Sequence, residues 1–438
     1  MRDLILVGIV IVCALIAVRR PVFGILTFVC FGIVNPQGMT WDFGRVFPLA
    51  MYTALGTIIG FALWSEPKRI PKQREVVMLL ALWGTFAIST LFAIYPNEAQ
   101  ERLTHISKIL LMTFLCMAIL NNEARLHLLL KVLALSLGFI GLKSGTFVIA
   151  SGGGQMVYGP EESFLASNNS IGLALAMNVP LLVYVLKREQ NRHVKWLVRT
   201  MIAMSYPAVV CTFSRGAWIG LAAATAMLVL KGRHKFMMVA VLCTAAIFAI
   251  PFLPERVTNR YDDLRNYQEE GSAQSRLWNW EFCKRVGVAH PLTGGGFNFY
   301  SLENYARYYP EFLDRWPGKL WTCHSSWFTI LGEHGVLAFL IWISLMASCL
   351  LSLRRLRAYA RSHPDDAWRL QFADTVQIAM ITYMIVATFL DAAYFDMFYE
   401  LVASIIIAKE LIRRQELQAA ETARAASFER PVLGVKAG

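Results

Sequence analysis

Long apolar runs dominate the chain. Runs of about 17 to 25 apolar residues, the length that a tilted helix needs to cross a bilayer, recur along most of the sequence and are separated by short charged segments. They predict an all-α polytopic membrane protein with about twelve crossings. After two shorter apolar stretches, Leu4–Val18 and Val22–Val34, the predicted helices lie at roughly 46–64, 76–94, 103–120, 126–150, 167–186, 194–211, 215–231, 235–253, 324–353, 372–390 and 394–411.

The first apolar stretch is short enough to resemble a signal peptide. Arg19-Arg20-Pro21 follows it, where small residues would mark a cleavage site. We therefore expect this stretch to be retained and to form a hairpin of two short helices with Val22–Val34. Either helix could enter the membrane without crossing it.

Two segments are hydrophilic, one at 254–323 and one after Lys409. They divide the chain into an N-terminal transmembrane bundle (1–253), a long loop containing short helices (254–323), C-terminal transmembrane helices (324–412) and a tail (413–438). Cytoplasmic loops are rich in Lys and Arg, so their alternation along the chain predicts a periplasmic long loop and a cytoplasmic tail. The basic loops are 68–74, 187–195, 231–235 and 354–369, and the intervening ones, 35–45, 95–102, 151–166 and 391–396, are poor in Lys and Arg.

Composition narrows the class of protein. With 56% hydrophobic and 16% charged residues, the chain is too apolar for a soluble domain, in which about a quarter of residues are charged. The net charge of +12 sits in alternate short loops, so it is a topology signal and we expect no nucleic-acid partner. In the long loop, nine basic residues balance nine acidic ones.

Metal, redox and nucleotide motifs are missing from the sequence. It contains no CxxC, HExxH, Asp-x-Asp, GxGxxG, P-loop or nucleophile-elbow pattern, so we expect neither a metal nor another cofactor. Of eight cysteines, only Cys283 and Cys323 share the long loop. A disulfide between them is possible, but we favour two unpaired thiols. The many aromatic residues of this loop suit an interfacial cap, which we favour, or carbohydrate stacking.

Three ionisable residues are candidates for chemistry. His324 opens the helix after the long loop, where an imidazole could act as a general base or form helix-start hydrogen bonds. Arg215 stands at an extracytoplasmic helix end, where it could bind a phosphate or extend to the interface. Arg276 lies in a short helix of the loop and alone would pass for a solvated charge. Glu333 and His334 are expected to be buried hydrogen-bonding residues.

Four motifs, in order around the long loop, resemble the O-antigen ligase family. They are Ser-Arg-Gly at 214–216, Ser-x-x-x-Arg at 272–276, His-Pro-Leu-x-Gly-x-Gly-Phe at 290–297, and His-Ser-Ser-Trp at 324–327 leading to Gly335. The glycines of the third motif permit close backbone approach. The N-terminal part, with Arg19-Arg20-Pro21, Asn35-Pro36 and Thr40-Trp41, resembles the branch of O-glycosylation ligases associated with exosortase systems.

The resemblance implies a GT-C-type glycosyltransferase of the bacterial inner membrane. Such an enzyme moves O-antigen from undecaprenyl diphosphate to a sugar hydroxyl of lipid A core in lipopolysaccharide biosynthesis, without a metal or nucleotide sugar. His324 would then activate the acceptor hydroxyl at the periplasmic face, and Arg215 and Arg276 would bind the diphosphate. The family often has His-Asn-x-Tyr where this chain has His-Ser-Ser-Trp, a departure that bears on the acceptor.

Four further residues are weaker candidates for the lipid-linked site. They are Lys143, Asn168, Asn169 and Asp391, all near predicted outer helix ends. Rival functions with the same chemistry are an O-antigen polymerase and a protein O-oligosaccharyltransferase. A transporter or flippase of lipid-linked glycans is the rival of another class, although the sequence shows no clear inverted repeat and the candidate charges lie at one face of the membrane rather than at its midplane.

Overall fold

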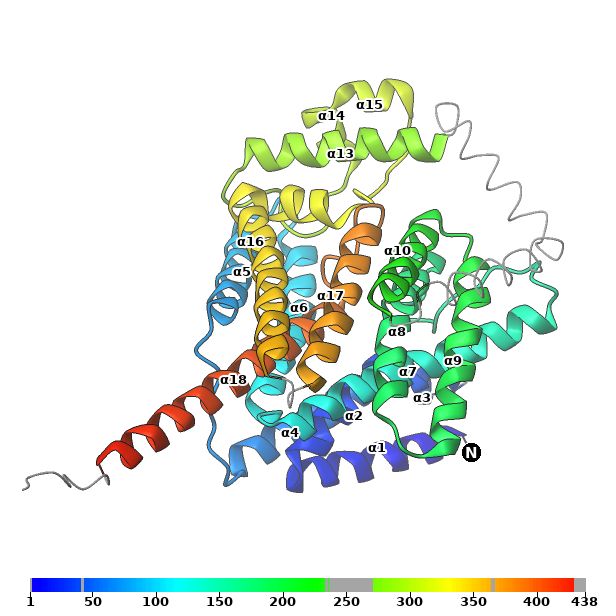
Figure 1. Cartoon of the computed structure of the whole chain (residues 1–438). Coiled ribbons are helices and arrows are strands. Elements are labelled where there is room, and N and C mark those ends of the chain that lie inside the picture. Colours follow the sequence, from blue (N-terminus) through cyan, green and yellow to red (C-terminus); the bar gives the residue numbers. More distant parts are fainter. Residues whose placement is uncertain (1, 41–42, 233–234, 236–270, 364–366, 429–438) are drawn as a thin grey trace, which may run out of the picture.

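The structure, a computed structural model, describes residues 2–40, 43–232, 235, 271–363 and 367–428. Within these residues the regular secondary structure is helical. Figure 1 shows their arrangement. They are α1 (Arg2–Arg19), α2 (Pro21–Val34), the short 3-10 helix η1 (Pro36–Met39), α3 (Phe43–Val46), α4 (Leu49–Leu63), α5 (Arg74–Leu91), α6 (Pro96–Ile119), α7 (Glu123–Ala150), α8 (Asn168–Arg188), α9 (Arg192–Val210), α10 (Arg215–Lys231), α13 (Gly271–Ala289), α14 (Leu302–Tyr308), α15 (Pro310–Arg315), α16 (Ser326–Ser362), α17 (Ala367–Ala387) and α18 (Asp396–Phe428).

Every predicted helix except 235–253, which lies outside the described residues apart from residue 235, overlaps one of these helices. The helices α1 and α2 form the expected pair with only Arg20 between them. Within the described ranges, α5, α6, α7, α8, α16 and α17 are long and apolar enough to cross a membrane, which indicates a multi-pass membrane protein. The count of twelve crossings stays a prediction. Two predicted loops, 95–102 and 354–369, are largely helical. The helix α6 already begins at Pro96, and a proline at the first helical position with Glu98 in the first turn favours a helix start. The helix α16 continues to Ser362 and α17 begins at Ala367.

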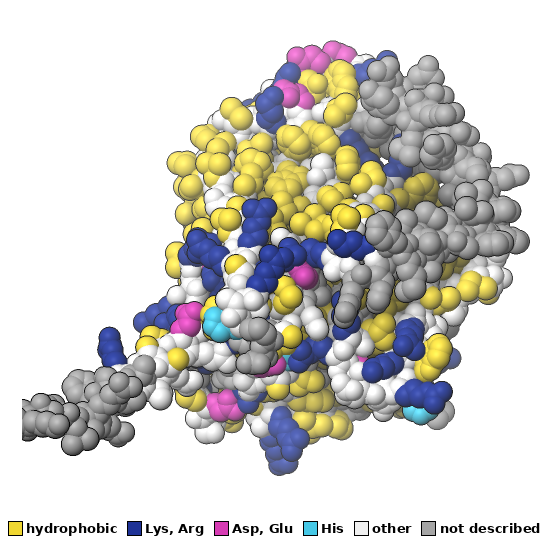
Figure 2. Space-filling view, in the orientation of Figure 1, with side chains coloured by type: hydrophobic (Ala, Val, Ile, Leu, Met, Phe, Trp, Pro, Cys, Tyr) yellow, Lys and Arg dark blue, Asp and Glu magenta, His cyan; other side chains and the backbone are white. Residues whose placement is uncertain are grey.

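Ion pairs join the ends of the helices that flank the basic loops. Lys231 Nζ and Arg357 Nε lie 2.7 and 3.3 Å from Asp374 Oδ1, which links the ends of α10 and α16 to the start of α17. Lys409 Nζ lies 2.5 Å from Glu75 Oε2 and links α18 to the start of α5. The helices α13 to α15 lie at the opposite end (Figure 1), and Figure 2 shows a broad hydrophobic surface between that end and a group of Lys and Arg side chains. The basic loops and the long loop therefore lie at opposite ends of the bundle.

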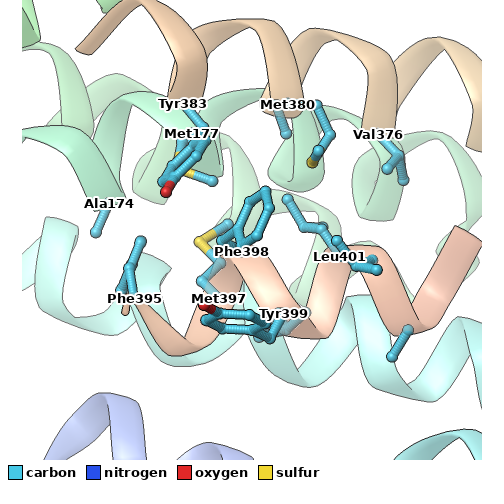
Figure 3. Packing of buried hydrophobic residues seen from close by; sticks show 14 of the residues in the cluster. Ala174, Met177, Val376, Met380, Tyr383, Phe395, Met397, Phe398, Tyr399 and Leu401 are labelled. Atoms are coloured by element: carbon cyan, nitrogen blue, oxygen red, sulfur yellow. The ribbon is translucent and has the colours of Figure 1, made fainter. Parts of the chain in front are cut away.

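The core between α8, α17 and α18 is densely packed (Figure 3). The rings of Tyr383 and Phe398 stack with centroids 4.7 Å apart, and both side chains are fully buried. Met177 and Met380, also buried, lie beside them. Tyr383 donates its hydroxyl hydrogen to the carbonyl oxygen of Ala392 at 2.9 Å, which fixes the segment between α17 and α18 against the core.

Helix α16 is broken at Gly335, whose φ of 81° belongs to the left-handed region. The break leaves carbonyl groups of the preceding turn without helical partners. Two backbone N–H groups of the glycine turn (290–297) bond to them, one to Gly332 O at 2.8 Å and one to Glu333 O at 2.9 Å. The turn therefore replaces the hydrogen bonds that the broken helix lacks.

Glycine is required in this turn because of the close approach to α16. Gly294 has a φ of 59°, and a Cβ atom there would lie 2.4 Å from the carbonyl carbon of Glu333. A Cβ on Gly296 would lie 2.3 Å from that of Ala93. The predicted close approach is thus to backbone and side chains of the protein itself.

The long loop folds into a cap with a small core of its own. The rings of Phe282, Tyr305 and Phe312 stack in series, with centroid distances of 3.8 and 4.3 Å, and all three are fully buried. Cys283 and Cys323 form a disulfide within this core, so the expectation of two unpaired thiols is wrong. Sequence separation gave no hint of the pairing, because it results from α13 folding back over the start of α16.

Candidate functional site

Two helices, α8 and α10, begin side by side. Ser167 and Ser214 precede them, and each hydroxyl oxygen caps the first turn by accepting a backbone N–H hydrogen bond. Asn168 Nδ2 donates to the carbonyl oxygen of Thr212 at 2.9 Å, which ties the two helix starts together. Phe213 has a φ of 53° and turns the chain into α10. The positive ends of two helix dipoles therefore lie close to each other.

A cavity of about 290 Å³ lies at these two helix starts. Arg215 and Arg276 both line it, together with Asn168 and Asn169, and both arginines are half-buried. Apolar residues from the end of α17 and the segment after it complete the wall. Four residues that the sequence singled out thus meet in one cavity, which we call the arginine cavity.

Arg276 is brought to the arginine cavity by α13, which crosses over the bundle (Figure 1). The ring of Trp280, one turn later, stacks on Phe328 of α16 at 5.1 Å and lies 6.4 Å from Phe389. Cys283, a further turn along, carries the disulfide. Positions 276, 280 and 283 share one face of a helix, so the helical spacing could have indicated that Arg276 faces the bundle.

His324 lies two residues before α16, close enough to Arg276 of the arginine cavity for the charge of that arginine to act on it. Its φ of 48° is uncommon for a residue with a side chain, and the surrounding structure holds it there. On one side, Cys323 is fixed by the disulfide. On the other, Ser326 Oγ donates to the carbonyl oxygen of Leu390 at 2.8 Å and accepts from Ala392 N at 2.8 Å. Because Leu390 lines the cavity, these bonds keep the histidine next to it.

The surroundings of His324 favour the neutral imidazole. Burial, and secondly the positive charge of Arg276, lower the pKa of His324 below its ordinary value of 6.5. A half-buried histidine of this kind carries no proton on one ring nitrogen at neutral pH, so it is able to accept one. The site therefore combines an anion-binding cavity with an adjacent proton acceptor.

Two weaker candidates lie outside the arginine cavity. Lys143 lines a neighbouring cavity of about 390 Å³, and Met156 contributes to both cavities. Asp391 follows Leu390 and is half-buried, where burial raises the pKa of its carboxyl group while the charge of Arg102 opposes that rise. Neither residue joins the four that line the arginine cavity.

Glu333 and His334 take part in a buried hydrogen-bond network, as predicted. His334 Nδ1 lies 2.5 Å from Ser89 Oγ, and its Nε2 lies 2.7 Å from the hydroxyl oxygen of Tyr394. That hydroxyl donates to Glu333 Oε2 at 2.5 Å. A neutral imidazole with its hydrogen on Nε2 satisfies all three bonds. The sequence gave no sign of the partners on α5 and before α18.

Other parts of the site were also missing from the sequence prediction. Phe389 and Met156 line the arginine cavity, but nothing in their sequence context distinguishes them from the many apolar residues around them. In the described part of the chain, no group of three or more His, Cys, Asp and Glu side chains could hold a metal ion.

Comparison with known proteins gives two family matches. Residues 200–343 match the family described as O-Antigen ligase, and residues 1–190 match one described as Family of unknown function (DUF5935). No curated protein matches the chain. Arg215, Arg276 and His324 lie in the first of these ranges, and Lys143 lies in the second.

The match at 200–343 supports the O-antigen ligase family, to which the four motifs also point. It fits a membrane glycosyltransferase of the ligase or polymerase type, in a setting of lipid-linked glycans and membrane lipids. The more specific placement beside exosortase systems stays a prediction.

Proposed function

We propose that the protein is an O-antigen ligase, which transfers O-antigen polysaccharide from undecaprenyl diphosphate to a sugar hydroxyl of lipid A core. The observation that carries this proposal is the arginine cavity, where two guanidinium groups and two helix starts surround one space beside His324. Such a space suits a doubly charged diphosphate.

The donor would bind through its diphosphate. Arg215 and Arg276 offer planar donor forks, which match the oxygens of phosphate groups and can bind two of them at once. The backbone N–H groups at the starts of α8 and α10 add donors that need no reorganisation. Both contributions strengthen as negative charge builds up on the leaving diphosphate.

The transfer itself needs one proton acceptor. His324 takes the proton of the acceptor hydroxyl while its oxygen attacks the anomeric carbon of the glycan. The bond between that carbon and the diphosphate oxygen breaks, its electron pair stays on the oxygen, and undecaprenyl diphosphate leaves. A neutral imidazole suits this role, which is consistent with the lowered pKa of His324.

We further propose that the cap faces the periplasm of a bacterial inner membrane. The basic loops lie at the end of the bundle opposite the cap, as cytoplasmic loops should. The disulfide between Cys283 and Cys323 supports the same orientation, since disulfides persist in oxidising compartments such as the periplasm.

A transfer assay with purified protein tests the function. Lipid-linked O-antigen and lipid A core are supplied without ATP or a nucleotide sugar, and the product is followed on a gel. We expect joined product, formed about 10² to 10⁴ times more slowly by the His324→Ala variant. A wild-type protein that forms no product with any acceptor would overturn the proposal.

The same assay separates the rivals. Transfer to the growing glycan would identify a polymerase, and transfer to serine-containing protein would identify a protein O-oligosaccharyltransferase. Movement of lipid-linked glycan across vesicles without any new covalent bond would identify a transporter.

A further inference from the structure

Lys143 is an ionisable residue within a membrane-spanning helix. It lies on α7, one of the helices long and apolar enough to cross a bilayer, and its side chain is exposed on the helix surface. Within the part of the chain that the structure describes, no ion pair includes Lys143. Lys143 lies near the outer end of this helix, where its ammonium group can reach an anionic group of a lipid at the membrane surface.

The cavity beside Lys143, of about 390 Å³, has both polar and apolar walls. Phe139 and Phe147, on the same helix, line it and are 44% and 42% exposed. Tyr158, from the segment before α8, lines it as well and is 61% exposed. We call this space the lysine cavity. Aromatic rings around an ammonium group suit a ligand that joins an anion to lipid chains.

Asn35 and Glu161, which also line the lysine cavity, already have partners. Asn35 Nδ2 donates to the carbonyl oxygen of Glu161 at 2.6 Å, and the carboxylate of Glu161 lies 2.5 Å from Arg45 Nη2. Arg45 also lies 2.9 Å from Glu162 Oε1, so Glu161 is held in an ion-pair group of its own. Lys143 is therefore the charged side chain of the described lining that no ion pair includes.

We propose that the lysine cavity binds a phosphate group of the acceptor lipid, so that the protein holds both lipid substrates side by side through separate anions. This inference rests on the proposed function. Lipid A carries phosphate groups next to its acyl chains, and its core sugars extend outward from them. A phosphate held by Lys143 would leave those sugars free to reach toward His324.

Two observations assign the lysine cavity to the acceptor. The donor diphosphate is already matched by two arginines and two helix starts in the arginine cavity. Met156 lines both cavities, so a second anionic lipid bound at Lys143 would lie directly beside the donor.

Kinetics with two acceptors test the proposal. We expect Lys143→Gln to raise the KM for phosphorylated lipid A core by about tenfold, the usual effect of losing one charge-assisted hydrogen bond, and to leave the donor KM unchanged. With enzymatically dephosphorylated acceptor, wild type and variant should have the same KM. Lys143→Arg keeps the charge and should restore most of the affinity.

Lys187→Gln is the matched control, because Lys187 is exposed near the end of α8 and lies outside both cavities. It should leave both KM values unchanged. The proposal is overturned if Lys143→Gln weakens both acceptors equally, or if it raises the KM of the donor instead. It is likewise overturned if added anionic phospholipid restores the wild-type KM of the Lys143→Gln variant for the phosphorylated acceptor.

A binding measurement keeps this inference distinct from the proposed function. Phosphorylated lipid A core, its dephosphorylated form, an anionic phospholipid and inorganic phosphate are each titrated against the protein in detergent, with thermal midpoint as readout. We expect stabilisation by phosphorylated lipid A core that Lys143→Gln removes. If the protein shows this stabilisation but no transferase activity, the proposed ligase function is wrong and the proposed lysine cavity stands. If the protein is an active ligase without this stabilisation, the ligase function stands and the lysine cavity is wrong.

Discussion

Two histidines stand ten residues apart at the beginning of α16, and their surroundings differ in kind. His324 is half-buried beside the arginine cavity and within the electrostatic influence of Arg276. His334 is fully buried, and Ser89 and Tyr394 engage both of its ring nitrogens. The first can exchange a proton with a ligand, whereas the second holds three helical segments together.

The contrast extends to the backbone around each histidine. His324 itself occupies the left-handed region, held by a disulfide on one side and by Ser326 on the other. His334 has a helical backbone, and the irregular residue is its neighbour Gly335. Strain at a side-chain-bearing residue next to a cavity favours a functional role, while a glycine break covered by its own turn favours a structural one.

Substitution of the two histidines gives the largest expected difference. His324→Ala should reduce the transfer rate by about 10² to 10⁴, the usual contribution of a general base, with little change in thermal midpoint. His334→Ala should lower the free energy of unfolding by about 1 to 3 kcal/mol, because buried partners lose their hydrogen bonds. Transfer by gel assay and unfolding in detergent are measured on both. Equal activity of His324→Ala and wild type would remove the base from the mechanism.

The arginine cavity gives the next effect. Arg215→Ala and Arg276→Ala should each lower transfer at fixed donor concentration by about tenfold to a hundredfold, because each removes donors to the diphosphate. Lysine at either position should recover only part of the loss, since a point charge does not reproduce a planar fork. The donor KM and kcat of purified variants measure the effect, with Arg307→Ala on the cap as an exposed-charge control. An unchanged rate in either alanine variant removes that residue from the cavity's function.

Sequence reasoning succeeded where one local signal sufficed. Apolar run lengths predicted α7 and α16, and charge alternation predicted that the basic loops lie together, which the ion pairs around Asp374 and Glu75 bear out. Motif order around the long loop brought Arg215 and Arg276 to one hypothesis, and the structure brings both to one cavity.

The rest depends on how distant segments pack. Cys283 and Cys323 pair because α13 folds back over α16, and no spacing rule encodes that fold. The partners of His334 come from α5 and from the segment before α18. Lys143 was grouped with the lipid-linked site, yet it lines a separate cavity, and Met156 from the segment before α8 lines both.

The disulfide between Cys283 and Cys323 provides a third test, because it fixes the backbone next to His324 and not the backbone next to His334. Replacing both Cys283 and Cys323 by Ala should destabilise the cap by about 2 to 4 kcal/mol, as loss of a disulfide usually does. Transfer should also fall, since the segment carrying His324 loses its attachment to α13. Cys349→Ala, a change at a buried free thiol far along α16, is the control. Retention of full activity and stability by the double variant would show that Ser326 alone positions the histidine.

The pH profile gives the smallest and most specific effect. His324 acts in its neutral form, and its pKa is lowered, so kcat/KM should rise with pH up to a point below 6.5 and then level off. Arg276→Gln removes a charge that lowers this pKa, so the rising limb should move to higher pH, although burial, the larger cause, keeps it below 6.5. Arg215→Gln should reduce the rate without moving the limb, because Arg215 is not a cause of the shift. If the profiles of the wild type and Arg276→Gln coincide, the charge of Arg276 does not act on His324. The contrast between His324 and His334 would then lose its electrostatic basis.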